Sequence, residues 1–240
     1  MWKNQGDELQ FVPVARVSEI IDVVWKPGTP TYRRGQYIEP CKLEFEKGIV
    51  KLDMIDKAQL LLEGPCDFMV MDTMHSFCIK GRASVTILSG GKGFEIKTPL
   101  ARYIDQGTKF YLDVQDVKDE LTVIEGSVDH VPFTGNPERL MQGNARRILL
   151  AKTIETISVE PNRFLDDNRF LQKLEQASAV VLATRQEGSQ RYNDDPNLLV
   201  RFDFDTTDGK TAVNRSNRGR NLIPNAVIHA GKVDEVSFTD

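Results

Sequence analysis

Residues 93–128 read GFEIKTPLARYIDQGTKFYLDVQDVKDELTVIEGSV, and this stretch carries the clearest structural pattern in the chain. Apolar residues alternate with polar ones in short runs, and Gly, Pro and Asp close each run. Alternation with a period of two between turn-forming residues is the pattern of half-buried β-strands. The stretch therefore predicts several short strands, and it contains no catalytic pattern. Its alternating apolar positions are Phe94 and Ile96, Ala101 and Tyr103, Phe110 and Leu112, and Leu121 and Val123.

The same rhythm extends upstream to Cys41. Strand-like runs recur about every 8–12 residues, the spacing of an all-β sandwich, barrel or short β-solenoid. No strict internal repeat is visible, which disfavours a regular solenoid. Glu46–Gly48 predicts a hairpin-like connection, and Gly64-Pro65 predicts a turn. Residues 67–72 (DFMVMD) look apolar on both faces, which indicates a strand sandwiched between two layers.

The N-terminal part also predicts β-strands. Residues 1–10 form a polar lead, and residues 11–25 are rich in β-branched side chains that suit one or two strands. Pro13 places the start of this region at a sheet edge, because proline donates no ladder hydrogen bond. Residues 26–36 contain several Pro and Gly and predict a loop.

The segment after Val131 allows two interpretations. A helix over 138–148 would gather Leu140, Met141 and Ile148 on one side. Gly143 in its middle would cost about 1 kcal/mol. We prefer a hairpin within 145–160 (ARRILLAKTIETISVE), which is rich in β-branched residues.

Residues 164–190 change to helical spacing, and we predict a single linking helix that acts as a spacer. Asp166 or Asp167 is the expected N-cap, and Gly188 is the expected stop. The apolar residues that recur at three- and four-residue steps are Phe170, Leu171, Leu174, Ala177, Val181 and Leu182.

Residues 193–240 form a tail of different character. LLVRFDFD (198–205) predicts a strand with alternate residues on one face. The remainder is rich in turns. A segment of about 45 residues is too short to bury a core of its own. The tail is therefore either docked on the first domain or the start of a domain that continues beyond it.

Composition excludes several classes of protein. The chain has 240 residues, 40% hydrophobic and 28% charged, with a net charge of −4. Binding to nucleic acid depends on neutralising phosphates, and the most basic stretch, Arg215–Arg220, predicts only a solvated loop. No apolar run reaches the ~18–20 residues of a membrane span, and the polar start is unlike a signal peptide. We expect a soluble chain without a cofactor, either cytoplasmic or part of a larger protein.

Cysteine and histidine are too scattered to predict a metal site. No C-x-x-C pair occurs, and the histidines lie far apart in sequence, whereas a zinc site needs clustered ligands. Cys41 alternates with Leu43 and Phe45, which indicates a buried thiol. The residues concerned are Cys41, Cys66 and Cys78, and His75, His130 and His229.

Two glycine- or aspartate-rich stretches resemble ligand loops. Ser89–Gly93 (SGGKG) lacks the spacing of a phosphate-binding loop and precedes a strand, so we expect a hairpin loop. Asp203–Asp208 imitates a calcium loop, but the glycine falls one place late and the closing position is Asn214. We predict no metal site at either stretch.

Acidic strand residues are the remaining enzymatic candidates. Glycoside hydrolysis needs two carboxyl groups roughly 5–10 Å apart, and sequence spacing does not show that any two converge. We therefore predict no catalytic residue and no enzymatic activity. The candidate carboxylates are Glu44, Glu46, Glu63, Asp105 and Glu125.

The opening stretch resembles the FecR domain. The matching pattern is G-F-x-I-x-T-P-x-A-x-Y-x-D-x-G-T-x-F followed by V-x-E-G-x-V, and residues 48–70 resemble the same family, with Cys66 where a small residue is common. The resemblance covers residues 11–157. The matching positions are Gly93, Phe94, Ile96, Thr98, Pro99, Ala101, Tyr103, Asp105, Gly107, Thr108, Phe110, Val123, Glu125, Gly126 and Val128.

These motif residues are structural markers and imply no catalytic role. Gly107 and Gly126 suit turn positions with unusual backbone angles. Thr98-Pro99 suits the end of a strand. Asp105 is placed to accept hydrogen bonds from backbone N–H groups in the turn before Gly107.

The FecR resemblance implies an extracytoplasmic sensor or regulatory module that acts by contact with a protein partner. Family members signal through a membrane helix to an anti-sigma segment, and this chain contains neither, so we expect it in the periplasm or at the cell surface as part of a larger membrane-anchored protein. The tail (193–240) resembles the start of a LamG-like jelly roll, which implies carbohydrate binding or adhesion as the alternative. The expected architecture is an all-β FecR-like domain, a helical linker and a partial β tail.

Overall fold

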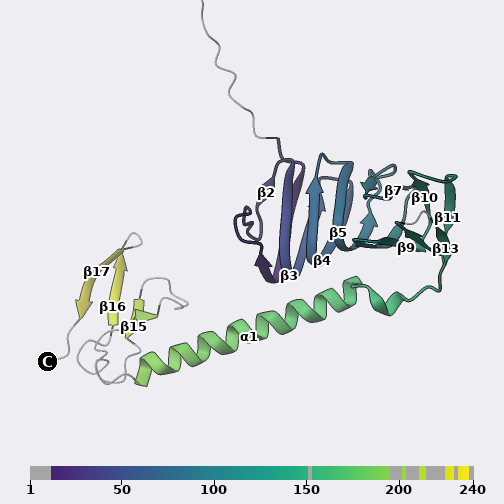
Figure 1. Ribbon diagram of the computed structural model, residues 1–240. Coiled ribbons are helices and arrows are strands. Elements are labelled where there is room, and N and C mark those ends of the chain that lie inside the picture. The colour runs from purple at the N-terminus through teal and green to yellow at the C-terminus, as the bar shows by residue number, and fades with distance from the viewer. Residues whose placement is uncertain are drawn as a thin grey trace, which may run out of the picture. The chain divides into compact units, whose positions relative to one another are not determined.

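The computed structural model describes residues 12–150 and 153–194, together with four short strands of the tail at 202–203, 211–214, 225–229 and 232–237. The chain divides into two compact units, one ending at Leu174 and the other beginning at Glu175. Each unit is described by itself. The first is almost entirely β-sheet, and the helix α1 (Asp167–Asp194) follows it (Figure 1). The predicted fold class, all-β with a single linking helix, is confirmed.

The first unit is built on one sheet of 13 strands. Neighbouring strands are antiparallel except for β5 and β6, which are parallel. The strands are β1 (Ala15–Trp25), β2 (Tyr37–Ile38), β3 (Cys41–Met54), β4 (Ala58–Val70), β5 (His75–Ile87), β6 (Glu95–Lys97), β7 (Ala101–Asp105), β8 (Lys109–Gln115), β9 (Lys118–Glu125), β10 (Ser127–Pro132), β11 (Glu138–Met141), β12 (Ala145–Leu149) and β13 (Ile154–Thr156).

The three long strands bend in the middle, and their bends lie side by side. The register of β3 against β4 shifts between Phe45 and Ile49 on one strand, and the register of β4 against β5 shifts after Glu63. Gly48, with φ of +101°, occupies the bend of β3. A Cβ at this position would lie 2.5 Å from the carbonyl oxygen of Asp22 on β1. Only glycine combines this backbone angle with so close an approach of the neighbouring strand.

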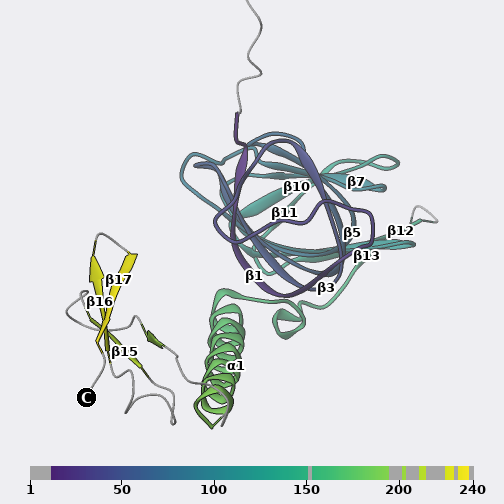
Figure 2. The same ribbon diagram turned by 90° about the vertical axis from the view of Figure 1, so that its left-hand side faces the viewer.

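The bends fold the sheet into two layers that enclose the core. The β6 strand pairs with the start of β5 (75–77), whereas β8 pairs with its end (81–86). We call the two halves layer A and layer B, and Figure 2 shows them on opposite sides of the interior, with β7 and β10 in layer A. Layer A contains 41–45 of β3, 67–70 of β4, 75–80 of β5, and β6, β7, β10 and β11. Layer B contains 15–21 of β1, 49–54 of β3, 58–63 of β4, 82–87 of β5, and β2, β8, β9, β12 and β13.

The core lies between the layers and takes its side chains from both. Alternating residues of each strand point inward, as the sequence pattern predicts. Apolar burial on this scale is the main stabilising term of the fold. The largest fully buried side chains include Phe45, Phe68, Phe94, Tyr103 and Phe110.

Four local predictions are wrong, and the bends explain three of them. Gly64-Pro65 is no turn between strands, because β4 continues through it and bends there. Glu46–Gly48 is no hairpin, because β3 continues through it from layer A into layer B. The loop over 89–93 is no hairpin either. It follows the end of β5, in layer B, and leads to β6, which pairs in parallel with the start of β5 in layer A. Residues 67–72 are not sandwiched, since Met69 and Met71 are 37% and 42% exposed.

Two other strand predictions are confirmed. Residues 15–25 form one strand, β1. The hairpin preferred within 145–160 is present as β12 and β13, which pair through Arg146 and Thr156, Arg147 and Glu155, and Ile148 and Ile154. The alternative helix over 138–148 is absent, because the chain turns at 142–144 between β11 and β12.

The helix begins as predicted but ends later. The Asp166 side chain accepts a hydrogen bond from the Arg169 amide at 2.8 Å, which makes Asp166 the N-cap. The predicted stop at Gly188 is wrong, because α1 continues to Asp194. One glycine costs a helix only about 1 kcal/mol, so the good helix formers around it continue the element.

The second unit contains a four-stranded antiparallel sheet. Its strands are β14 (Phe202–Asp203), β15 (Thr211–Asn214), β16 (Asn225–His229) and β17 (Lys232–Ser237), in that order. The strand predicted over 198–205 is described only at Phe202–Asp203, and the remainder of it, the Asp205–Asp208 stretch and residues 1–10 lie outside the described residues. Within the described residues, no helix has the length and apolarity needed to cross a membrane.

Candidate functional site

A row of charged side chains crosses the outer face of layer B. Each member stands on a different strand, directly opposite the next. Cross-strand neighbours on one face of a sheet interact, and opposite charges stabilise the pairing by roughly 0.2–1 kcal/mol. We call this row the charge ladder. In order, it consists of Glu63 (β4), Arg82 (β5), Asp113 (β8), Glu120 (β9), Arg147 (β12) and Glu155 (β13).

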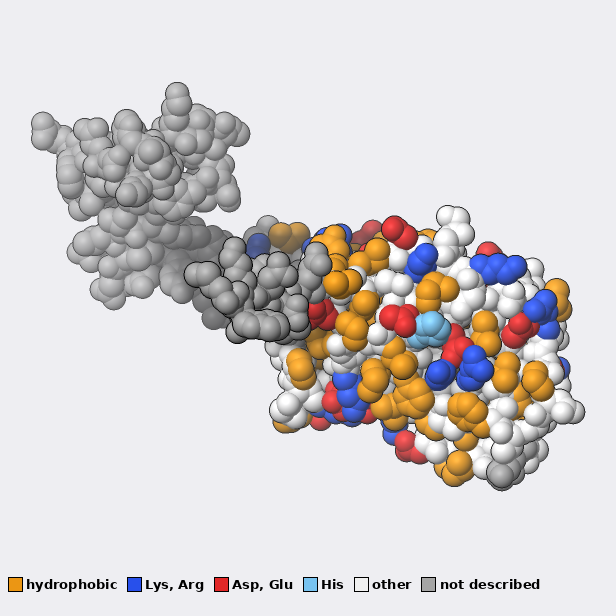
Figure 3. Space-filling model, turned by 90° about the horizontal axis from the view of Figure 1, so that it is seen from above, with side chains coloured by type: hydrophobic (Ala, Val, Ile, Leu, Met, Phe, Trp, Pro, Cys, Tyr) orange, Lys and Arg blue, Asp and Glu red, His pale blue; other side chains and the backbone are white. Residues whose placement is uncertain are grey.

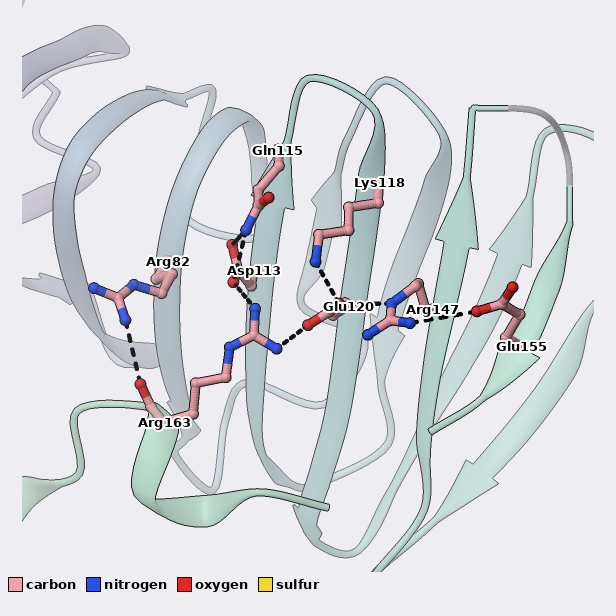
Figure 4. Close-up of polar contacts among 8 residues, drawn as sticks. All are labelled: Arg82, Asp113, Gln115, Lys118, Glu120, Arg147, Glu155 and Arg163. Carbon is pink, nitrogen blue, oxygen red and sulfur yellow. Dashed lines mark hydrogen bonds and ion pairs between the residues drawn. The ribbon is translucent and has the colours of Figure 1, made fainter. Parts of the chain in front are cut away.

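The charge ladder alternates in sign except at one step. Asp113 and Glu120 are direct cross-strand partners, both acidic and almost fully buried, at 5% and 1% side-chain exposure. Two like charges in this position destabilise a sheet. Arg163, from the short 3₁₀ turn Pro161–Arg163 before α1, lies between them and bonds both carboxylates (Figure 4). Its Nη2 is 2.5 Å from Asp113 Oδ2, and its Nη1 bonds Glu120 Oε2.

Glu120 is held ionised by three cations. Lys118 Nζ lies 2.8 Å and Arg147 Nε 2.7 Å from Glu120 Oε1. Burial by itself would raise the pKa of Glu120. Hydrogen bonds from Lys118, Arg147 and Arg163 outweigh burial and lower that pKa to about 2. Glu120 is therefore a fixed acceptor for arginine and a poor proton donor.

The backbone of the connecting segment is also bonded to layer B. Arg82 Nη1 donates to the Arg163 carbonyl at 3.2 Å, and Ser84 Oγ donates to the Leu165 carbonyl at 2.5 Å. The Leu165 amide in turn donates to Glu63 Oε1 at 3.3 Å. Side-chain and backbone bonds together fix residues 163–165 on the sheet.

Apolar contacts complete this attachment. Phe164 stacks on Tyr111 with ring centroids 4.8 Å apart, and Phe164, Leu165 and Phe170 are buried. Lys109 Nζ bonds Asp167 Oδ2 at 2.6 Å at the start of α1. The site is therefore a clamp, defined here as the charge ladder, Ser84, Lys109 and Tyr111, which holds residues 163–170.

Two hollows flank Arg163. The larger, of about 490 Å³, lies beside the bends, and the smaller, of about 300 Å³, lies beside β12 and β13. In the larger hollow Lys80 bonds Asp116 at 3.0 Å, and Arg82 lies 3.6 Å from Glu63. These cations are already paired. Within the described residues no three or more His, Cys, Asp or Glu side chains cluster as a metal site would require.

The acidic candidates from the sequence are spread over β3, β4, β7 and β9. Glu63 belongs to the charge ladder and lines the larger hollow. Glu44 lies on layer A beside Lys42, at 2.9 Å. Glu46 is exposed at the bend, Asp105 is buried at the end of β7, and Glu125 is exposed at the end of β9. The sequence analysis missed Asp113, Glu120 and Arg163, because only strand register makes them neighbours.

The FecR-like motif residues are not members of the clamp, although Glu125 is the cross-strand partner of Lys109, and they support turns and core. Phe94 and Phe110 are fully buried, and Thr108 is nearly so. Gly93, with φ of +90°, and the exposed Pro99 stand in the connections before and after β6.

Motif turns from distant parts of the stretch meet one another. The Asp105 carboxylate accepts the predicted bond from the Gly107 amide, at 2.6 Å, although burial raises the pKa of Asp105 to about 6. Gly126, with φ of +73°, packs against this turn, and a Cβ there would lie 2.5 Å from the Gly107 carbonyl oxygen and 2.8 Å from Thr108. The motif spacing thus reflects the packing of two turns.

Thr98 supports a buried carboxyl that the sequence analysis missed. Its hydroxyl bonds Asp119 Oδ2, and Tyr103 OH donates to the same oxygen at 3.2 Å. Burial raises the pKa of Asp119 to about 6, against the lowering effect of these bonds. Tyr103 also stacks on the buried His130, with ring centroids 5.5 Å apart.

The described cysteines are all free thiols. Cys66 and Cys78 are buried, and burial raises the pKa of both thiols. Cys41, predicted to be buried, is half-buried.

Comparison with known proteins gives little. No protein-family model matches the chain, and no curated protein matches it. Among solved structures, two crystal structures of a putative anti-sigma factor from Parabacteroides distasonis ATCC 8503, at 2.50 and 1.65 Å resolution, are similar to the chain. Each has a TM-score of 0.45 and 14% sequence identity, and the match covers 51% of this chain and 61% of that one. Similarity at this level supports no argument about function.

Proposed function

We propose that this chain is a FecR-type regulatory module that acts by contact with a protein partner and has no catalytic activity. The observation that carries the proposal is the clamp, in which Arg163 neutralises the Asp113–Glu120 pair and attaches the start of α1 to the sheet. A change at the sandwich is thereby transferred to the helix that follows. In line with the family resemblance, we place the module in the periplasm or at the cell surface, as part of a larger membrane-anchored protein.

The electrostatics of the clamp favour this proposal over an enzyme. Hydrolysis by paired carboxylates needs one group with a raised pKa to donate a proton. Glu120 has the opposite shift, and Arg163 lies between it and Asp113, where a substrate atom would have to enter. Asp119 has a raised pKa but lies in the core, bonded to Thr98 and Tyr103.

A physical test is hydrogen exchange of the intact chain. Replacing Arg163→Ala should speed exchange of the amides at 163–170 at least tenfold, because the attachment loses its central ion pairs. Arg139→Ala is the matched control, since Arg139 pairs with Asp129 on layer A. Exchange at 163–170 that stays as slow as in the parent chain would show that Arg163 does not hold the connector.

A functional test is transcript profiling of the source organism. Deletion of the coding sequence should change a defined set of transcripts, Arg163→Ala should reproduce the change, and Arg139→Ala should behave as the parent. If deletion changes no transcript, the regulatory proposal is wrong. Glycan-array binding by the full chain, unaffected by Arg163→Ala, would instead favour the carbohydrate-binding alternative through the LamG-like tail.

A further inference from the structure

The end of the β4–β5 hairpin presents three soft or borderline metal ligands on the outer face of layer A. Met69 and Met71 are 37% and 42% exposed, although their neighbours Phe68 and Val70 are fully buried. The side chain of His75 is 48% exposed. Figure 3 views this side of the molecule, where hydrophobic side chains gather among charged ones. Two exposed methionines beside a histidine have no role in the core or in the clamp.

Strand register places Met71 opposite His75, whereas Met69 is opposite Phe77 and diagonal to His75. Val70 pairs with Ser76, and the Met71 amide donates to the His75 carbonyl at 3.1 Å, so Met71 and His75 face each other across the hairpin. Side chains in such positions have Cβ atoms about 5 Å apart. Met69 is two residues from Met71 on the same face, roughly 7 Å away. A thioether on a flexible side chain spans these gaps.

His75 is oriented by a carboxylate. Its Nδ1 lies 2.9 Å from both carboxylate oxygens of Asp72, and the same carboxylate accepts the amides of Met74 and His75 at 2.7 and 2.8 Å. The bond sets a proton on Nδ1 and leaves the Nε2 lone pair for another partner. A carboxylate behind a histidine is the usual outer support of a metal-binding imidazole.

The ligand types select the metal. Thioether sulfur is a soft donor that prefers Cu(I), whereas Mg²⁺ and Ca²⁺ require oxygen. Met74 does not join the set, since its Cε lies toward Gly93. Two thioethers and one imidazole make a three-coordinate, neutral donor set suited to a monovalent soft ion.

We propose that Met69, Met71 and His75 form a binding site for Cu(I), positioned by Asp72. The site is separate from the clamp and does not depend on the regulatory function. The bound metal ion would lie on the outer face of layer A, which no described segment of this chain covers.

The test uses Ag(I), a redox-inert d¹⁰ ion with the same ligand preference, on the full chain. Cys41→Ser serves as the background, because Cys41 is the half-buried thiol and Cys66 and Cys78 are 2% and 1% exposed. Affinity is measured by competition with a chelator, and methionine methyl signals are followed by NMR. The variants are Met69→Leu, Met71→Leu, His75→Gln and Asp72→Asn. Met141→Leu, at a 56% exposed methionine on β11, is the matched control.

The expected result is one equivalent of Ag(I), with methyl shifts at Met69 and Met71 only. Met71→Leu and His75→Gln should each weaken binding at least tenfold, and Asp72→Asn should weaken it roughly tenfold through the orientation of His75. Met141→Leu should leave the affinity unchanged. All these side chains are on the surface, so circular dichroism should remain that of the parent. An affinity unchanged by Met71→Leu and His75→Gln would overturn the proposal, and the exposed methionines would then be part of a protein-contact surface.

Discussion

The two outer faces of the sandwich carry similar residues and serve different purposes. On layer B, the charge ladder contains two adjacent acidic residues, Asp113 and Glu120, and Arg163 pairs with both. Layer A carries ion pairs complete within the sheet, such as Arg102 with Glu95 at 2.6 Å and Arg139 with Asp129 at 2.5 Å. On layer B a like-charge step is neutralised by a residue from outside the sheet, whereas these ion pairs on layer A need no such residue.

The largest loss of stability should come from crowding the bend that creates the two layers. Gly48→Ala adds a Cβ 2.5 Å from the Asp22 backbone at φ of +101°, and we expect a loss of about 3–5 kcal/mol in the free energy of unfolding. Urea denaturation followed by circular dichroism measures it.

Gly28→Ala is the control for Gly48. Gly28 also has a positive φ, of +79°, but a Cβ there would meet nothing within 4 Å. We expect a loss of about 1 kcal/mol from the backbone angle alone. Equal losses at the two glycines would mean that crowding at the bend contributes nothing.

The next largest effect should come from the arginine that closes the ladder. Arg163→Ala leaves Asp113 and Glu120 side by side without their shared cation. Breaking a buried pair costs about 3–5 kcal/mol, and because Arg163 is 30% exposed we expect about 2–3 kcal/mol. The double variant Arg163→Ala/Glu120→Gln should recover part of the loss, as it removes the repulsion. A double variant less stable than the single one would contradict the ladder argument.

The clamp and the core should lose or gain stability in different pH ranges. The pKa of Glu120 is lowered to about 2, so the folded chain binds fewer protons there than the unfolded chain. Its stabilisation is present above about pH 4.5 and disappears as the pH falls toward 2. The pKa of Asp119 is raised to about 6, so stability falls as the pH rises from about 4 to 6.

Variants assign the two pH windows. Glu120→Gln should flatten the unfolding free energy below about pH 4.5, and Asp119→Asn should flatten it between about pH 4 and 6, each by an amount of the order of 2 kcal/mol. Unfolding curves across the pH range measure both. Identical profiles for parent and variants would show that other groups govern the response.

The smallest loss of stability should come from breaking an ion pair on layer A. Arg139→Ala removes a pair in which Arg139 is 55% exposed, and exposed pairs contribute about 0.2–1 kcal/mol. We expect about 0.5 kcal/mol by urea denaturation. A loss as large as that of Arg163→Ala would erase the contrast between the two faces.

Much of the fold could be predicted, because strand alternation and turn residues are local. The alternation around Phe94, Tyr103 and Phe110 correctly predicted buried positions, and Asp166, one of the two predicted caps, is the N-cap of the helix. Local signals misled where a turn residue lies inside a strand. Glycine at position 48 is equally compatible with a turn that ends a strand and with a bend inside a strand, so the sequence pattern does not distinguish them.

The candidate site could not be predicted, because its members are brought together by register. Asp113 and Glu120 are separated by a short turn, but Arg163 comes from 43 residues beyond Glu120. A one-residue slip would move each side chain to the other face of its strand. No spacing rule connects residues whose contact depends on the pairing of six strands.

Local sequence patterns were sufficient to predict the β class, the turn around Gly107, the hairpin within 145–160 and the presence of the helix. Each of these follows from short-range preferences of the backbone and from the period of burial. Long-range packing makes Glu46–Gly48 a bend, gives the sheet two layers and brings Arg163 to the charge ladder. These depend on contacts between distant residues, whose energies exist only once the strands have paired.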